Sequence, residues 1–228
     1  MEIFLDTANI SEISHILRWG IVDGITTNQK IFQNEKGVDP ITRVQEICKM
    51  VHPRPVSVES NGMSLEEILS DARKFSKVSD NVIVKVAMTG NGMGLEAISI
   101  LAGEGIKTNC TIMMNLNQLI LATKAGATYA SLFYNRAKDS GEDPIQTIKQ
   151  FTSWTRSNGY KTRLIVGSIR SPNDVSDAAA AGADIITIPY KVMTAMPYHK
   201  KTEETILEFD MAWKDFMSSA AYHTVNSK

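Results

Sequence analysis

Short apolar runs alternate along the whole chain with longer segments in which apolar residues recur at every third or fourth position. The short runs, rich in β-branched residues, are typical of buried strands, and the longer segments are typical of amphipathic helices. We predict strands at residues 3–5, 24–26, 56–58, 82–86, 106–109, 129–132, 164–166 and 185–188, with helices between them. Such regular alternation indicates parallel βα units.

The number of these units favours a closed barrel. Eight units in 228 residues, about 28 residues each, predict an α/β fold made of a single (β/α)8 TIM barrel that spans residues 1–228. The alternative is a doubly wound open sheet, which normally carries a glycine-rich phosphate loop after its first strand. Here Asp6-Thr-Ala-Asn9 follows the first strand, so the nucleotide-binding form of the open sheet is disfavoured.

Local signals mark several helix ends. Gly126 and Gly182 each stand three residues before a predicted strand, where glycine takes the left-handed position that ends a helix. Ser171 followed by Pro172 predicts a helix start. Asn9-Ile-Ser-Glu12 resembles a capping box with Asn in place of Ser or Thr.

One more helical pattern follows the eighth unit, at residues 201–220. Its apolar positions are spaced by three and four residues: Ile206, Phe209, Trp213, Phe216 and Ala220. We therefore predict an extra C-terminal amphipathic helix. The pattern leaves open whether this helix packs on its own barrel or on a neighbouring subunit.

Composition narrows the function classes. The chain has 24 Lys and Arg against 25 Asp and Glu, interspersed, so it lacks the basic field that holds a nucleic-acid backbone. No window approaches the roughly eighteen apolar residues of a membrane span, and the N-terminus has no signal-peptide pattern. We expect a soluble, cytoplasmic protein that binds neither nucleic acid nor membrane.

Metal and disulfide chemistry are also unexpected. Cys48 and Cys110 are too few for a disulfide framework or a zinc site, and the four histidines have no metal-binding spacing. The sequence therefore predicts no metal.

Lys85 is the most informative candidate for chemistry. It lies in Asn81-Val-Ile-Val-Lys-Val-Ala-Met88, where its neighbours are apolar. Since side chains alternate along a strand, Lys85 points into the barrel if Val84 and Val86 face the helices. Burial disfavours the charged form of a lysine, which leaves some neutral amine able to form a Schiff base. The alternative is that the ammonium reaches the strand end and stays protonated.

Polar residues also end the other predicted strands, and in a barrel these ends form the active-site face. They are Asp6, Thr26, Thr27, Asn28, Glu59, Asn109, Thr111, Ser131, Arg136, Ser168 and Arg170. Singly, each has a structural explanation, such as helix capping or a core ion pair. Together they suit carbonyl chemistry, and the two arginines with Ser168 suit a phosphate. The alternative for the arginines is pairing with Asp139 or Glu142.

Several stretches match a known family in order and spacing. They are Phe4-Leu-Asp-Thr-Ala-Asn9, Gly24-Ile-Thr-Thr-Asn28, Val56-Ser-Val-Glu59, Val82-Ile-Val-Lys85 with Met88-Thr89, Thr108-Asn-Cys-Thr111, Ser131-Leu-Phe133 with Asn135-Arg136, and Ser168-Ile-Arg170. Through them nearly the whole chain resembles the transaldolases, in the short subfamily that also contains the fructose-6-phosphate aldolases. The resemblance implies a class I aldolase-type barrel that needs no cofactor and forms a homo-oligomer, a pentamer or decamer.

The resemblance also implies catalytic roles. Lys85 would form the Schiff base, and Asp6 would take the proton from the C4 hydroxyl when the C3–C4 bond breaks. Glu59 and Thr111 would hold the water that moves protons while the Schiff base forms.

The resemblance also implies which residues contact the substrate. Asn28, Asn109 and Ser131 would contact the three-carbon dihydroxyacetone unit, with Thr27 beside them. Arg136, Ser168 and Arg170 would hold the phosphate of the sugar. The aldolase branch has a tyrosine near Phe133 and a glutamine near Glu59, so this chain carries the transaldolase-like pair.

The implied reaction is transfer of dihydroxyacetone from fructose 6-phosphate or sedoheptulose 7-phosphate to erythrose 4-phosphate or glyceraldehyde 3-phosphate. Phe133 offers no phenol to protonate the enamine, which favours transfer over free cleavage. The alternatives are an aldolase that releases free dihydroxyacetone and a barrel that only binds sugar phosphates.

The chain departs from the family at three places near the mouth of the barrel. Proline usually follows the Thr-Thr-Asn triplet, where this chain has Gln29 and then Lys30. Leu132 stands where proline usually follows the serine of the sixth strand, and Val86-Ala87 replaces a common Ile-Pro. The missing prolines reduce local rigidity. The nucleophile and acid/base positions are unchanged.

Overall fold

The computed structural model describes residues 1–35 and 37–218. In this part of the chain, eight parallel strands close into one barrel in sequence order. They are β1 (Glu2–Asp6), β2 (Gly24–Thr26), β3 (Val56–Glu59), β4 (Val82–Ala87), β5 (Thr108–Met113), β6 (Tyr129–Phe133), β7 (Arg163–Gly167) and β8 (Ile185–Pro189). Since β8 pairs in parallel with β1, the predicted (β/α)8 barrel is confirmed.

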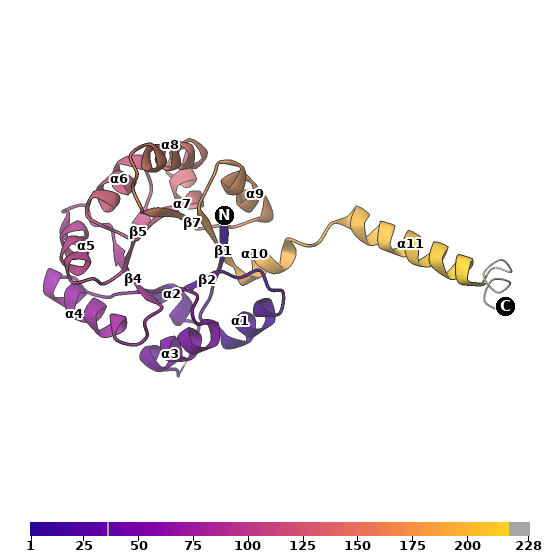
Figure 1. Ribbon diagram of the computed structural model, residues 1–228, viewed down its shortest axis with the longest axis horizontal. Helices are drawn as coiled ribbons and strands as arrows, with labels where there is room; N and C mark the ends of the chain where they lie inside the picture. Colours follow the sequence, from indigo (N-terminus) through magenta and orange to yellow (C-terminus); the bar gives the residue numbers. More distant parts are fainter. Residues whose placement is uncertain (36, 219–228) are drawn as a thin grey trace. The chain divides into compact units, whose positions relative to one another are not determined.

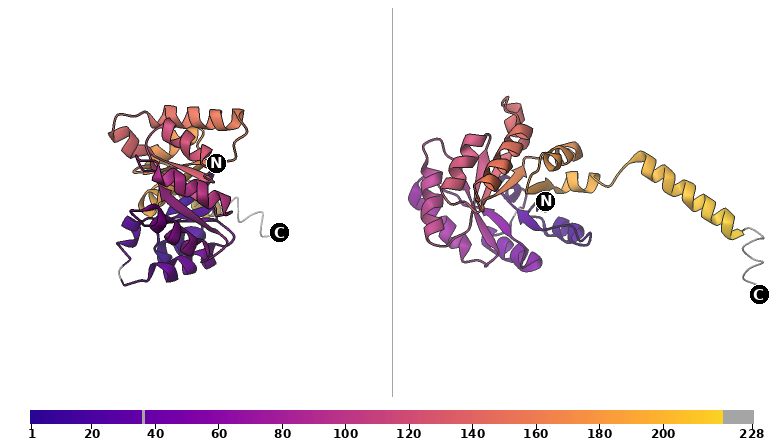
Figure 2. Two further views of the ribbon diagram at one scale, coloured as in Figure 1. Left: turned by 90° about the vertical axis from the view of Figure 1, so that its left-hand side faces the viewer. Right: turned by 45° about the horizontal axis from the view of Figure 1, so that its top comes forward.

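Helices follow the strands and surround them (Figure 1, Figure 2). They are α1 (Ile10–Leu17), α2 (Gln29–Phe32), α3 (Pro40–Val51), α4 (Leu65–Ser76), α5 (Met93–Gly103), α6 (Leu116–Lys124), α7 (Tyr134–Asp139), α8 (Pro144–Ser157), α9 (Pro172–Ala180) and α10 (Tyr190–Ala195). The last of these, α10, begins within the unit of residues 1–193 and ends two residues beyond it. Among the described residues, no helix combines the length and the apolar character that crossing a membrane requires.

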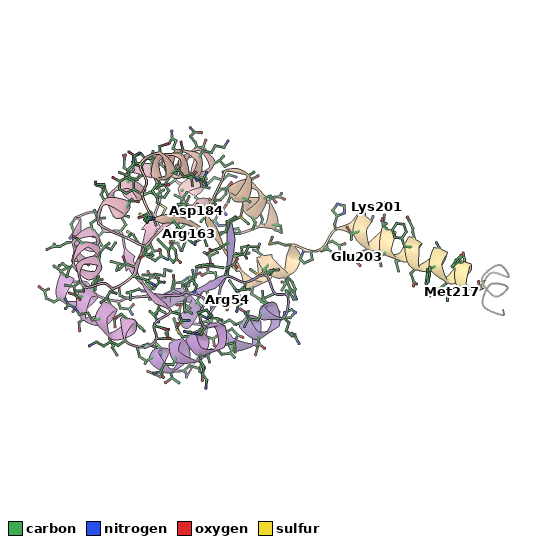
Figure 3. All side chains as sticks on the ribbon, viewed as in Figure 1. Arg54, Arg163, Asp184, Lys201, Glu203 and Met217 are labelled. Atoms are coloured by element: carbon green, nitrogen blue, oxygen red, sulfur yellow. The ribbon has the colours of Figure 1, made fainter. Side chains whose placement is uncertain are left out.

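The chain divides into two compact units, Met1–Met193 and Thr194–Lys228. The first unit is the barrel. The second contains α11 (Lys200–Ser218), whose two ends carry Lys201 and Met217 (Figure 3). This helix confirms the C-terminal helix predicted at 201–220, of which residues 219 and 220 lie outside the described part.

Side-chain alternation separates two cores. Val82, Val84 and Val86 belong to the large cluster that joins the strands to the helices. A second cluster fills the inside of the barrel, with Phe4, Ile83, Tyr129, Ile165 and Ile185. Because Ile83 and Lys85 share a face of β4, the prediction that Lys85 points into the barrel is confirmed.

The inner cluster closes the barrel on the N-terminal side of the polar residues. Phe4, Ile83 and Tyr129 each precede an inward polar residue by two positions, and the rings of Phe4 and Tyr129 meet edge to face with 6.2 Å between centroids. Four members of the cluster are at most 3% exposed, and Tyr129 is 8% exposed. The inner cluster therefore separates the polar end of the barrel from its N-terminal end.

The predicted helix ends are largely confirmed. Gly126 and Gly182 have φ of 94° and 93°, the left-handed conformation that favours glycine. Ser171 caps α9 and forms a capping box with Asp174. Asn9 caps α1, but Glu12 accepts a hydrogen bond from the Thr7 hydroxyl and does not complete the box at Asn9.

The fifth strand differs from the prediction. It begins at Thr108, two residues after the predicted Ile106, whose N–H instead donates to the carbonyl of Leu101 at 2.9 Å and closes the turn after α5. At its other end the register with β6 shifts between Cys110 and Met113, and Ile112 has a φ of 62°. This irregularity turns Met113 into the outer core, although strict alternation would place it inside with Thr111.

Gly24 makes room for the inner cluster. A Cβ at this position would lie 2.6 to 2.9 Å from three atoms of the Phe4 ring, which is its partner in the β1–β2 register. We expect Gly24→Ala to lower the free energy of unfolding by about 1–3 kcal/mol, because a filled core must shift to accept the methyl group. Urea denaturation of the two proteins measures this difference.

Gly103→Ala is the matched control, since a Cβ at that helical position meets no described atom within 4 Å beyond its chain neighbours and the backbone of its own helix. It should leave stability unchanged or raise it slightly. Equal stability of wild type and Gly24→Ala would contradict the packing described for Phe4.

Candidate active site

Lys85 is the buried centre of the site. Its side chain donates from Nζ to the carbonyl of Thr27 at 2.8 Å and lies 3.5 Å from a carboxylate oxygen of Glu59. Lys85 is only 5% exposed. A buried amine needs such partners because loss of water penalises its charged form. The structure therefore excludes the alternative in which the ammonium reaches solvent at the strand end.

Asp6 lies at the end of β1 and lines the same cavity as Lys85. The Thr26 hydroxyl donates to its carboxylate at 2.6 Å and lies 2.5 Å from the Thr187 hydroxyl. Burial raises the pKa of Asp6, and the Lys85 charge and the Thr26 hydrogen bond offset this rise only in part. A carboxyl group with a raised pKa exchanges protons closer to neutral pH, as a general acid or base must.

A buried polar network lies beside Lys85. The Ser131 hydroxyl donates to the side-chain oxygen of Asn109 at 2.7 Å, and the Asn109 nitrogen lies 3.3 Å from the Ser57 hydroxyl. These bonds fix the orientation of the Asn109 amide. The Thr111 hydroxyl is buried and has no hydrogen-bond partner within the described residues. An unpartnered buried hydroxyl of this kind suits a bound water or ligand.

These side chains line one cavity of about 120 Å³. Its lining is Asp6, Thr26, Asn28, Lys85, Asn109, Thr111, Ser131, Phe133, Arg136, Ile165, Gly167, Ser168 and Thr187. Since one water molecule takes up about 30 Å³ in the liquid, the cavity admits a small polar molecule. A neighbouring hollow of about 270 Å³ contains Glu59 and shares Asn28, Phe133 and Arg136 with the cavity.

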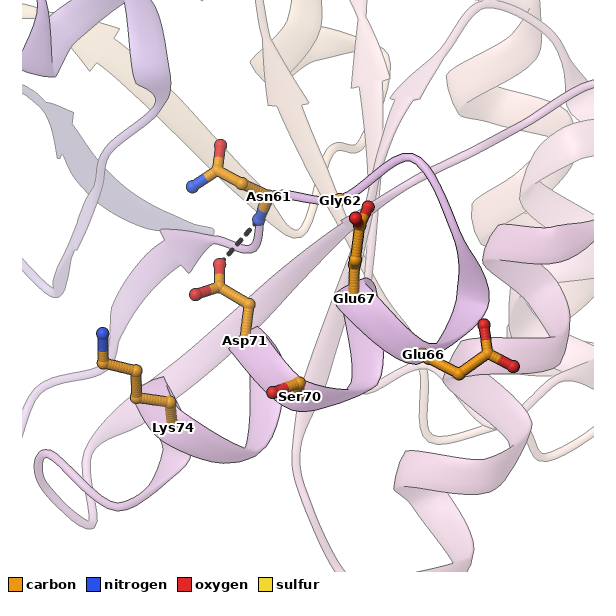
Figure 4. A pocket seen from close by; sticks show the side chains of 7 residues that line it. All are labelled: Asn61, Gly62, Glu66, Glu67, Ser70, Asp71 and Lys74. Atoms are coloured by element: carbon orange, nitrogen blue, oxygen red, sulfur yellow. Dashed lines mark hydrogen bonds between the residues drawn. The ribbon is translucent and has the colours of Figure 1, made fainter.

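A larger hollow of about 620 Å³ lies over α4 and is lined by Asn61, Glu66, Glu67 and Asp71 among others (Figure 4). None of the predicted site residues lines it. The smaller cavity is the better candidate, because a buried amine, a carboxyl group and several hydrogen-bonding groups converge there.

Two cationic side chains line the cavity, Lys85 and Arg136. The guanidinium of Arg136 lies 5.2 Å from the centre of the Phe133 ring, and both residues line the cavity. Arg170 does not line it. Its guanidinium donates two hydrogen bonds to Asp139, at 3.1 and 2.5 Å, which is the pairing that the sequence left open as an alternative.

Asp174 organises the loop between β7 and α9. Its carboxylate accepts from the N–H groups of Arg170 and Ser171 at 2.8 and 2.9 Å and from the Asn135 amide at 2.8 Å. Burial alone would raise the pKa of Asp174, but these hydrogen bonds outweigh burial and lower it. The Asn135 amide also donates to the carbonyl of Ser168 at 2.9 Å, and Ser168 has a φ of 59°, a conformation that needs support from its surroundings.

Comparisons with known proteins cover nearly the whole chain. The sequence model of the family described as Transaldolase/Fructose-6-phosphate aldolase matches residues 3–228. A probable transaldolase of Lactiplantibacillus plantarum is 42% identical over 96% of this chain and 99% of its own. A probable transaldolase of Thermoplasma acidophilum is 43% identical over 94% of this chain and 96% of its own. The chain belongs to the transaldolase/fructose-6-phosphate aldolase family.

The structure brings most of the predicted site residues of this family member together. All of them line the cavity except Glu59, Thr27 and Arg170. Glu59 lies next to Lys85. The backbone carbonyl of Thr27 accepts a hydrogen bond from Lys85, and the Thr27 hydroxyl donates to the backbone carbonyl of Ser57. Arg170 remains a predicted phosphate ligand whose guanidinium is paired with Asp139. Across residues 1–35 and 37–218, no three His, Cys, Asp or Glu side chains gather closely enough to hold a metal ion.

Two polar residues of the site were missed by the sequence reasoning. Thr187 lines the cavity from β8, and Ser57 contacts Asn109 from β3. Thr187 is the single polar residue of Ile185-Ile-Thr-Ile-Pro189, and Ser57 stands between two valines in Val56-Ser-Val-Glu59. That signal, which identified Lys85, was also available for them.

The raised pKa of Asp6 predicts the pH dependence of stability. Since its carboxyl group ionises more readily in the unfolded chain, its contribution to stability falls as pH rises above the ordinary value of 3.8 through the folded pKa. We expect Asp6→Asn, which cannot ionise and can still accept from Thr26, to be more stable than wild type at pH 7. Urea denaturation at pH 7 and near pH 3.5 measures the difference, which should vanish at the lower pH.

Asp39→Asn is the control of opposite sign, because hydrogen bonds from Thr42 lower the pKa of Asp39. This variant should gain no stability at pH 7. If Asp6→Asn were less stable than wild type at both pH values, the environment assigned to Asp6 would be wrong.

Proposed function

We propose that the protein is a transaldolase that works through a Schiff base on Lys85. It would transfer dihydroxyacetone from fructose 6-phosphate or sedoheptulose 7-phosphate to erythrose 4-phosphate or glyceraldehyde 3-phosphate. The observation that carries this proposal is the buried Lys85 amine, placed in a small polar cavity with Asp6 and beside Glu59. The relatives described as probable transaldolases support it.

The first stage is formation of the Schiff base. The neutral amine of Lys85 attacks the C2 carbonyl of the ketose, and the resulting carbinolamine loses water to give a protonated imine. Glu59 and Thr111 are proposed to hold the water that carries protons in both steps. Asn28, Asn109 and Ser131 would hold the hydroxyl groups of the three-carbon unit.

The second stage is cleavage and transfer. Asp6 takes the proton of the C4 hydroxyl, the C3–C4 bond breaks, and its electron pair moves into the imine to form an enamine while an aldose phosphate leaves. The enamine then attacks the aldehyde of the acceptor, and Asp6 returns the proton. Hydrolysis of the new imine releases the product ketose and restores the Lys85 amine.

Two features of the cavity bear on the substrate. Arg136 and Ser168 line the cavity and suit the phosphate of the sugar. Arg170 would become a further phosphate ligand if its guanidinium left Asp139. Phe133 presents a ring without a hydroxyl group, so it cannot protonate the enamine. The enamine is therefore expected to wait for an acceptor aldehyde.

The test is mass spectrometry after incubation with fructose 6-phosphate and sodium borohydride. We expect a stable adduct of dihydroxyacetone size on Lys85, because borohydride reduces the imine to an amine that cannot hydrolyse. Lys85→Ala should give no adduct. Asp6→Asn should form the imine but cleave it about 10²–10⁴ times more slowly, since it lacks the acid/base group.

The alternatives give different products. An adduct of whole-sugar size in the wild type would mean that this ketose binds but is not cleaved, which points to another substrate. Absence of any adduct would favour a barrel that only binds sugar phosphates. Release of free dihydroxyacetone without an acceptor, at the rate of transfer, would identify the fructose-6-phosphate aldolase activity instead.

We also propose a cytoplasmic homo-oligomer, a pentamer or decamer, in which α11 packs on a neighbouring subunit. Ile206, Phe209, Trp213 and Phe216 recur at spacings of three and four on α11, and Phe209 and Trp213 are 71% and 60% exposed. Large apolar side chains that recur at this spacing on one helix are typical of a face that is buried in an interface.

Deletion of the residues after Lys201 should reduce the assembled mass in analytical ultracentrifugation. Phe209→Glu with Trp213→Glu should have the same effect, because charges on the apolar face oppose burial. An unchanged assembled mass in both variants would contradict the proposed packing of α11 on a neighbouring subunit.

A further inference from the structure

Gln29 distinguishes this chain from the family beside the proposed catalytic groups. It is the first residue of α2, directly after the capping residue Asn28, at the position where the resemblance of the sequence leads us to expect proline. Proline suits that position because the first helical N–H needs no partner within the helix. The backbone therefore does not require glutamine here. What glutamine adds is a side-chain amide.

That amide contacts Glu59. Its nitrogen faces the carboxylate and lies 2.8 Å from Oε2 and 3.3 Å from Oε1, since the opposite orientation would set the amide oxygen against a carboxylate. Oε2 is also the oxygen that lies 3.5 Å from Nζ of Lys85, and the Glu59 side chain is only 8% exposed. Glu59 is thus held between the amine of Lys85 and the amide of Gln29.

Asn61 holds Gln29 in turn. In this orientation the amide oxygen of Gln29 lies 2.9 Å from Oδ1 of Asn61, so the Asn61 amide is turned as well and its nitrogen donates to Gln29. The backbone N–H of Asn61 donates to Asp71 on α4 at 2.7 Å (Figure 4). A continuous series of polar contacts therefore runs from α4 through Asn61, Gln29 and Glu59 to Lys85. Such outer contacts fix the orientation of the groups that do the chemistry.

We infer that Gln29 is a positioning residue for Schiff-base formation, acting through Glu59; this inference rests on the proposed function. Loss of water from the carbinolamine requires a proton on its hydroxyl group while the nitrogen lone pair forms the C=N bond. Glu59 must deliver and accept these protons through a bound water in a fixed orientation. The side-chain donor of Gln29 maintains that orientation, which proline at this position cannot do.

The inference separates two steps of the reaction. Imine formation depends on Glu59 and therefore on Gln29. Cleavage of the C3–C4 bond depends on Asp6, which lies on β1 and has Thr26 as its hydrogen-bond partner. Loss of the Gln29 amide should slow the first step and leave the second unchanged, whereas a general disturbance of the site would slow both.

Single-turnover kinetics test this separation. Wild type, Gln29→Met and Gln29→Glu are mixed with fructose 6-phosphate, quenched with borohydride at increasing times, and analysed by mass spectrometry of the Lys85 peptide. Gln29→Met keeps the length of the side chain and removes its donor, so we expect total adduct to form about tenfold more slowly. Gln29→Glu should be at least as slow, because two carboxylates would repel.

The conversion of whole-sugar adduct to dihydroxyacetone adduct measures cleavage and should keep its wild-type rate in both variants. Gln33→Met is the matched control, since it makes the same chemical change at an exposed glutamine directly after α2. It should form the adduct at the wild-type rate.

The outcomes are distinct. A wild-type rate of adduct formation in Gln29→Met, or equal slowing of adduct formation and cleavage, would overturn the role of Gln29 and leave the proposed function intact. Equal slowing in Gln33→Met would also overturn it, because the effect would then belong to the helix. Absence of a Lys85 adduct in the wild type would overturn the proposed function and this inference together.

Discussion

Burial of the Lys85 amine is the constraint on which the rest of the site depends. An amine inside a barrel must be paired, and removal of one partner of a buried ion pair costs about 3–5 kcal/mol. The Thr27 carbonyl and the Glu59 carboxylate meet this need from the two preceding strands. Phe4, Ile83 and Tyr129 fill the barrel on the N-terminal side of the amine. The pairing with Lys85 therefore fixes the position of Glu59.

Two carboxyl groups interact with this amine, and their surroundings differ. Asp6 lies inside the cavity, where burial raises its pKa and a threonine hydroxyl orients it. Glu59 lies beside the cavity, where the Lys85 amine and the Gln29 amide orient it. Groups of the same chemical type take different roles when their environments differ in this way. The proposed division between proton transfer at C4 and proton transfer at the imine has this physical basis.

Backbone irregularities shape the mouth of the barrel. The register shift at Ile112 lets Thr111 face the cavity while Met113 packs outside, and Ser168 takes a left-handed conformation in a loop held by Asp174. Non-glycine residues rarely adopt such conformations, and they persist only where the surroundings over-determine them. Both irregularities occur where strands β5 and β7 deliver polar groups to the site.

The sequence by itself determined the barrel, the inward direction of Lys85 and the helix ends at Gly126, Ser171 and Gly182. These features follow from local periodicity and from single residues with special backbone preferences, which act over a few positions. Only the tertiary structure decided that Gln29 meets Glu59 and that Arg170 pairs with Asp139. Such contacts join different strands and loops, so they depend on strand register and side-chain reach, and neither leaves a local pattern in the chain.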